Sequence, residues 1–165
     1  MLHILEPEFN PPRFISEYQL GHFAFLMSFA FFCLGAGSLF LARTLWIDLR
    51  TKTGRVGGWW IILVGTAYIG AGIFAPDPTS IVGSRLHGLF GIIVIFSSPI
   101  VFALLNRGLI QNEGWSEAKH LFKWMTMLAW LGLLLFYGSI ILFYGLAYGS
   151  NTTVVGWTNR FMVAP

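Results

Sequence analysis

Four long stretches of the chain carry no Asp, Glu, Lys or Arg, and this charge pattern limits the fold more than any other feature. The stretches cover residues 18–42, 56–76, 86–106 and 124–159. An α-helix needs about 20 apolar residues to cross the hydrocarbon core of a bilayer, so each stretch is long enough for one crossing. A soluble helix would need a polar face, whereas these stretches are apolar all round. The sequence therefore predicts four spanning helices, near 19–44, 57–75, 84–106 and 121–149.

The composition favours the same membrane-embedded fold. Hydrophobic residues make up 56% of the chain and charged residues only 10%, and so few charges cannot cover a water-exposed surface. Since the bilayer core holds no water, each backbone amide must find its partner inside its own segment, which excludes strands for these stretches. No long linker divides the sequence. We therefore expect residues 1–165 to form a single transmembrane domain, an all-α, integral membrane four-helix bundle.

Basic residues are divided unevenly between the two sides that these helices define. One side carries Arg13, Arg85 and Arg160. The first and third connections, on the other side, carry Arg43, Arg50, Lys52, Arg55, Arg107, Lys119 and Lys123. Cytoplasmic connections are the richer in Lys and Arg, so both termini are predicted to be extracytoplasmic. The chain is then a multi-pass membrane protein with its first and third connections in the cytoplasm.

The remaining composition agrees with this orientation. Five tryptophans fall near the predicted inner boundary, where an amphipathic ring is favoured: Trp46, Trp59, Trp60, Trp115 and Trp124. In a membrane protein, the net charge of +3 reports orientation and contact with acidic lipid headgroups. We expect membrane lipid as a partner and no nucleic acid.

Small residues recur at a spacing of three or four, which places them on one face of a helix. Such pairs let helix backbones approach closely inside a bilayer. The pairs are Cys33 and Gly37, Thr66 and Gly70, Ala67 and Ala71, Gly88 and Gly91, and Gly145 and Gly149. We expect these faces, including the single cysteine, to be packing surfaces.

A group of polar side chains falls at the outer ends of the predicted helices: Ser16, Glu17, His22, Asp77, Arg85 and His87. His22 and His87 could ligate a heme iron or the magnesium of a chlorophyll-type pigment, and Glu17 and Asp77 could add oxygen ligands for a metal. Ionisable groups near a membrane are a hint of function by default.

A structural explanation accounts for the same residues and is the one we favour. In this explanation Asp77 pairs with Arg85, Ser16 or Glu17 caps the first helix, and the histidines bond to loop carbonyls. Charges at the membrane boundary cost little. No catalytic residue and no metal site is predicted, because the chain lacks three convergent zinc ligands with a base and has no G-x-S-x-G nucleophile motif.

Four segments in a fixed order resemble a known family. FISEYQLG, GAGIFAPDP, RLHGLFG and GWTNRF are similar to the motifs of a bacterial membrane family called domain of unknown function 998. Members commonly have six helices, so the resemblance implies a shortened member with four. The resemblance implies a multi-pass protein of the bacterial inner (cytoplasmic) membrane and brings no activity with it. The matched positions are Ser16, Glu17, Gly72, Asp77, Pro78, His87, Gly88 and Arg160.

Three functions remain open, and the sequence favours the first. The chain could be a non-catalytic accessory subunit that packs its Phe-rich helices against a larger bacterial membrane complex, respiratory or photosynthetic. It could instead bind lipid or a small molecule such as quinone, heme or a chlorophyll-type pigment, with His22 and His87 as cofactor ligands. In that case the phosphate group of a lipid would contact Arg85 and Arg160. The polar site would also contain Ser16, Glu17 and Asp77. The third hypothesis is a small membrane enzyme built on Glu17, His22, Asp77 and His87.

Overall fold

The described part of the chain is mostly helical. The computed structural model describes residues 5, 7, 14–111, 113–142, 155 and 157–159, and no strand occurs among them. The main elements are η2 (Ile15–Leu20), α2 (Ala24–Leu45), α3 (Lys52–Ile73), α4 (Ile81–Leu109), η3 (Glu113–Trp115) and α5 (Lys119–Ile140). Helices α2 to α5 are long and apolar enough to cross a membrane. The prediction of an all-α, multi-pass membrane protein with four spans is confirmed, while its orientation stays a prediction.

The helices begin at their caps and not at the first apolar residue. Helix α3 starts at Lys52, ahead of the predicted 57, because the Thr51 hydroxyl accepts from the Gly54 backbone N–H at 3.0 Å. Helix α4 starts at Ile81 because the Ser80 hydroxyl accepts from the Gly83 N–H at 3.1 Å. Such caps satisfy backbone donors that the first turn leaves free.

The first and last predicted spans need a different correction. The first was predicted from residue 19, but residues Ile15–Leu20 form the separate 3-10 helix η2, and α2 follows at Ala24. The fourth was predicted to reach 149. Helix α5 ends at Ile140, and residues 143–150 lie outside the described part.

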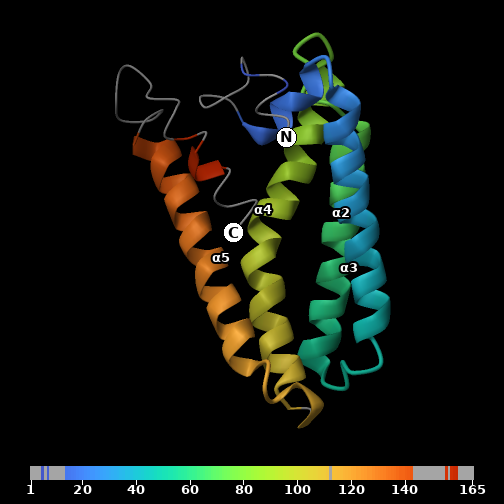
Figure 1. The fold of residues 1–165 in the computed structure, drawn as a ribbon, viewed down its shortest axis with the longest axis vertical. Helices are drawn as coiled ribbons and strands as arrows, with labels where there is room; N and C mark the ends of the chain where they lie inside the picture. Colours follow the sequence, from blue (N-terminus) through green and yellow to red (C-terminus); the bar gives the residue numbers. More distant parts are fainter. Residues whose placement is uncertain are drawn as a thin grey trace.

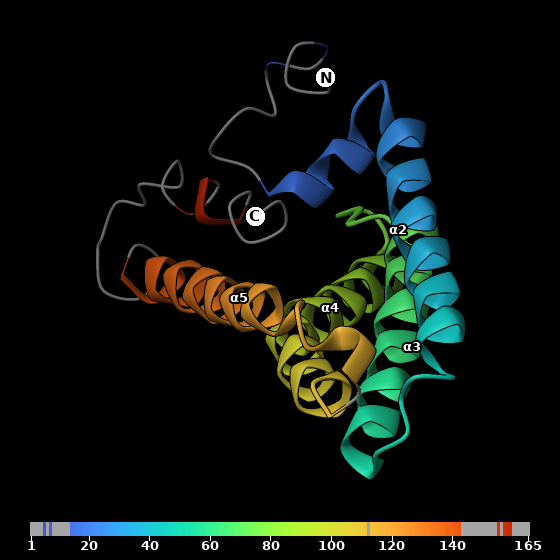
Figure 2. The same ribbon diagram turned by 60° about the horizontal axis from the view of Figure 1, so that its bottom comes forward.

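The four long helices pack in sequence order, so the bundle is open. Helix α2 packs on α3, α3 on α4, and α4 on α5, and Figures 1 and 2 show this row curving in an arc. Helix α5 diverges from α4 toward the end drawn at the top of Figure 1. We call that end, with residues 14–23 and 74–80, the upper end. The lower end carries the connections 46–51 and 110–118.

Two pairs of glycines set the closest approaches between helices. A Cβ added to Gly35 of α2 would lie 2.8 Å from the carbonyl oxygen of Gly65 in α3. A Cβ on Gly108 of α4 would collide with the backbone of Gly54 in α3. Both contacts join backbone to backbone, so only glycine fits there.

The predicted small-residue faces divide into packed and open ones. The prediction is confirmed for Ala67, Gly70 and Ala71, which are buried in α3. It is wrong for Cys33, which is exposed, and for Gly37, where an added Cβ would meet no atom within 4 Å. Gly88 and Gly91 of α4 are equally open, Thr66 is exposed, and Gly145 and Gly149 lie outside the described residues.

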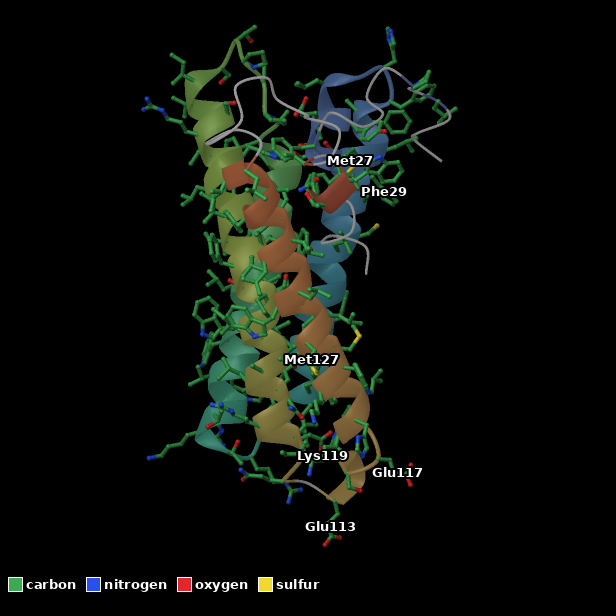
Figure 3. All side chains as sticks on the ribbon, turned by 90° about the vertical axis from the view of Figure 1, so that its left-hand side faces the viewer. Met27, Phe29, Glu113, Glu117, Lys119 and Met127 are labelled. Carbon is green, nitrogen blue, oxygen red and sulfur yellow. The ribbon has the colours of Figure 1, made fainter. Side chains whose placement is uncertain are left out.

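The lateral surface is apolar and the charges gather at the ends. Phe40 and Leu134 are 70% and 67% exposed, as expected for side chains that meet lipid tails. Figure 3 shows Phe29 on the flank of the molecule and Glu113, Glu117 and Lys119 at its lower end. The seven basic residues predicted for the inner side all belong to this lower end, on the ends of the long helices or their connections.

Candidate functional site

The C-terminal end of α3 is capped by a side chain from outside the helix. Gln19 of η2 is buried, and its Nε2 donates to the carbonyl oxygens of Ala71 at 3.0 Å and Gly72 at 3.4 Å. The same nitrogen lies 3.0 Å from the hydroxyl oxygen of Ser28 in α2. The last carbonyls of a helix have no partner within the helix, so Gln19 satisfies them and fixes η2 against α2 and α3.

His87 of α4 completes this cap. Its Nδ1 donates to the carbonyl oxygen of Phe74, the C-cap residue that follows α3, at 2.7 Å. A carbonyl can only accept, so Nδ1 carries the proton and Nε2 of the neutral ring is left with a lone pair. The His87 side chain is 7% exposed and packs edge-on against the Phe31 ring, with the centroids 6.3 Å apart. The prediction that histidines bond to loop carbonyls is thus confirmed for His87.

A cavity of about 590 Å³ lies between η2, α4 and α5 at the upper end. Its polar lining includes Ser16, Glu17, Ser84, His87 and Asn159, together with Tyr137. Its apolar lining includes Leu20, Ile92, Ile95, Phe136 and Ile140. The remaining wall contains Gly88 and Gly91, whose missing side chains leave α4 uncovered where α5 diverges. The face that the sequence predicted as a helix contact is therefore one wall of the cavity.

A short segment near the C-terminus joins η2 to α5 across this region. The backbone N–H of Ile15 donates to Oδ1 of Asn159 at 3.0 Å, and Asn159 is buried. The hydroxyl groups of Ser139 in α5 and Thr158 lie 2.7 Å apart, at hydrogen-bonding distance. Sequence reasoning missed both Asn159 and Gln19. Each is an uncharged amide within a long stretch that carries no charged residue. An amide side chain in such a stretch was the signal that could have identified them.

Three of the predicted site residues come together in the cavity lining: Ser16, Glu17 and His87. The Oε1 atom of Glu17 accepts from the Phe14 backbone N–H at 3.2 Å. Glu17 therefore caps the start of η2, whereas the sequence predicted a cap on the first spanning helix. Since that helix starts only at Ala24, the cap belongs to the element before it.

Asp77 and Arg85 take no part in the lining, although Pro76 and Pro78 beside Asp77 do. The Asp77 carboxylate accepts from the backbone N–H and the hydroxyl of Thr79, both at 2.8 Å. These bonds, the backbone one first, hold the pKa of Asp77 below its usual value because they favour the ionised form. No ion pair joins Asp77 to the exposed Arg85 among the described side chains. The predicted pair is wrong, because the tight turn supplies Asp77 with nearer donors.

The two histidines predicted as cofactor ligands do not share the cavity. His22 is exposed in the turn before α2 and does not line it. Arg160, predicted as part of a lipid site, lies outside the described residues. In the described ranges, no three His, Cys, Asp or Glu side chains are grouped so that they could hold a metal ion.

Comparison with known proteins gives one match. A family model described as "Protein of unknown function (DUF998)" matches residues 1–165. No curated protein and no solved structure matches the chain.

Proposed function

Because the chain belongs to the DUF998 family, whose function is unknown, its role has to be inferred from its own geometry, and we propose that it binds an amphipathic, lipid-like molecule. The observation that carries this proposal is the cavity of about 590 Å³ at the upper end, polar near η2 and apolar along α4 and α5. Sites for small molecules typically enclose about 300–1,000 Å³, with apolar walls and a few convergent polar groups.

The position of the cavity supports a ligand that arrives from the membrane. Its apolar wall, formed by residues such as Ile95 and Ile140, lies on two helices that can cross a bilayer. An acyl or isoprenoid chain could lie against Gly88 and Gly91, where α4 carries no side chains. Moving such a chain out of lipid brings no hydrophobic gain, because lipid tails are as apolar as the wall. Selection among lipid-like molecules must then come from the polar end of the ligand.

The chemistry of His87 indicates what that polar end is. Nδ1 is occupied by the Phe74 carbonyl, so Nε2 is the ring atom that can meet a ligand, and in the neutral ring it is an acceptor. Among the described residues His87 makes no other hydrogen bond. The matching ligand carries a donor, such as an alcoholic or phenolic hydroxyl group. A phosphodiester, which offers only acceptors, is a poorer match to this atom.

Orientation follows from charge. The seven basic residues of the lower end favour the cytoplasmic side, so the proposed site opens toward the outer half of a bacterial cytoplasmic membrane. The accessory-subunit hypothesis stays a prediction, because lipid tails cover the exposed apolar side chains as well as a partner subunit would. We propose no reaction.

Filling the cavity tests the proposal. Gly91→Leu directs a side chain into the cavity from a Cβ position that has no atom within 4 Å. Gly37→Leu is the matched control, because its Cβ position is equally open but lies on α2, away from the cavity. The probe is a long-chain fatty alcohol with a photoreactive diazirine, added to the purified full chain. We expect labelling of α4 and α5 in the native protein and the control, and a loss of several-fold in Gly91→Leu.

A second probe in the same experiment tests which head group binds. The methyl ether of the probe lacks the donor and should bind about two- to tenfold more weakly, which corresponds to one hydrogen bond. Equal labelling of the Gly91→Leu and Gly37→Leu variants would refute binding in the cavity. Equal binding of alcohol and ether would refute only the role given to His87 and would leave binding in the cavity intact.

A further inference from the structure

A second hollow lies at the opposite end of the molecule, between α2 and α3. It has a volume of about 320 Å³ and is lined by Leu39, Ala42, Arg43, Trp46, Trp59 and Ile62. A smaller hollow of about 180 Å³, lined by residues of α3, shares Trp59 with it. We call the first the Trp groove. It shares no residue with the upper cavity.

Packing holds the two aromatic walls of the Trp groove in place. The rings of Trp46 and Trp59 meet edge to face, with centroids 5.5 Å apart and planes at 86°. The indole ring of Trp46 packs against α3 at Gly58, where an added Cβ would come within 3.0 Å of the ring. The two rings therefore pack against each other, although Trp46 is 39% and Trp59 62% exposed. A slender apolar chain can lie against such walls at low cost in side-chain ordering.

The polar groups of the Trp groove are all hydrogen-bond donors. Arg43 offers a guanidinium group and the two indoles offer one N–H each, and no carboxylate is among the described residues that line the groove. Within the ranges that the structure describes, Arg43 makes no ion pair, and neither Trp46 nor Trp59 uses its indole N–H. The nearby Asp48 accepts from the indole N–H of Trp115 at 3.1 Å. The groove thus combines positive charge with unpaired donors at a membrane boundary.

We propose that the Trp groove binds an anionic phospholipid. The phosphate meets Arg43 and the indole N–H groups, and an acyl chain lies along Leu39 and Ile62. The charge of the lower end is complementary to such a lipid, since six further Lys and Arg residues lie there, and each basic group near an anionic surface contributes about 1 kcal/mol. A free phosphate ion would leave the apolar part of the groove unused, so the lipid is the better occupant.

Native mass spectrometry of the full chain tests this site. The protein is titrated in mild detergent with phosphatidylglycerol or with phosphatidylcholine of the same acyl chains. We expect the first phosphatidylglycerol molecule to bind at a lower lipid concentration than further phosphatidylglycerol molecules do. It should also bind at a lower concentration than phosphatidylcholine. Arg43→Gln should weaken that binding about fivefold, the equivalent of one basic contact. Arg107→Gln removes the same charge from another exposed position at the lower end and should change it less than twofold.

Three results would overturn the proposal. An equal loss in both arginine variants would show diffuse attraction to the lower end, and equal binding of the two lipids would remove the anionic preference. Displacement of the lipid by inorganic phosphate alone would assign the groove to a free ion. Trp59→Leu, which should weaken both lipids, keeps the test decisive if Arg43→Gln fails to fold. None of these results depends on the upper cavity.

Discussion

Two glycines of α2 allow the packing of the helices to be tested with one chemical change. Gly35 and Gly37 lie two residues apart, and each becomes alanine. At Gly35 the new Cβ would lie 2.6 Å from Cγ1 of Ile69 and 2.8 Å from the carbonyl oxygen of Gly65. At Gly37 nothing lies within 4 Å. The two variants therefore differ only in what the added methyl group meets.

The two substitutions are expected to change the free energy of unfolding differently. Replacing glycine by alanine inside a helix stabilises it by about 1 kcal/mol, and both variants gain this. Gly35→Ala also pushes a methyl group into a backbone carbonyl, which cannot rotate away, and overpacking of this kind costs about 1–3 kcal/mol. We expect Gly37→Ala to be stabilised by up to about 1 kcal/mol and Gly35→Ala to fall about 1–3 kcal/mol below it.

Thermal unfolding of both variants in one detergent, followed by the loss of helical circular dichroism, measures this difference. For a chain of this size about 1 kcal/mol corresponds to a shift of about 2–4 °C in the unfolding midpoint. If Gly35→Ala raises the midpoint as much as Gly37→Ala does, then α2 and α3 do not cross at Gly35 and Gly65, and the arrangement of the row is wrong.

Two further predictions concern the upper end. Gln19→Leu should destabilise the protein by about 1–3 kcal/mol, because the carbonyls of Ala71 and Gly72 lose their donor; an unchanged unfolding midpoint would show that Gln19 does not cap α3. With Cys33 replaced by Ala, a membrane-impermeant maleimide should label Thr79→Cys in intact cells and Glu117→Cys only after lysis, both positions being exposed. The reverse pattern would place the upper end in the cytoplasm.

The number of candidate spanning helices and their approximate positions along the chain could be predicted from the sequence, because both follow from the gaps between charges. The bilayer excludes Asp, Glu, Lys and Arg over a fixed thickness, so the gaps between charges locate the spans. The exact starts could not be found this way, since Thr51 and Ser80 cap α3 and α4 from outside the apolar stretches. A cap is a local hydrogen bond, and hydropathy does not report it.

The sequence does not predict how each helix is rotated about its axis, and this rotation determines which residues line the candidate site. A helix that is apolar all round gives no signal for which face meets a neighbour. Ala67 and Ala71 and the pair Gly88 and Gly91 have similar spacing, yet the first pair is buried and the second is open. The sequence could place Glu17 and His87 at one depth, but only the tilt of α5 shows that they border a cavity.

The same side chains build the upper end and define its chemistry, and this determines which variants are informative. His87 holds the end of α3 through Nδ1, and that bond fixes the tautomer that leaves Nε2 as an acceptor. Replacing His87 would change the fold and the site together, so a lost ligand would have two explanations. Gly91 contributes to the cavity only by lacking a side chain, and a substitution there changes the space and leaves the cap in place. The test of binding therefore uses substitution of Gly91. The hydrogen bond to His87 is tested by changing the donor group of the ligand, and His87 itself is left unchanged.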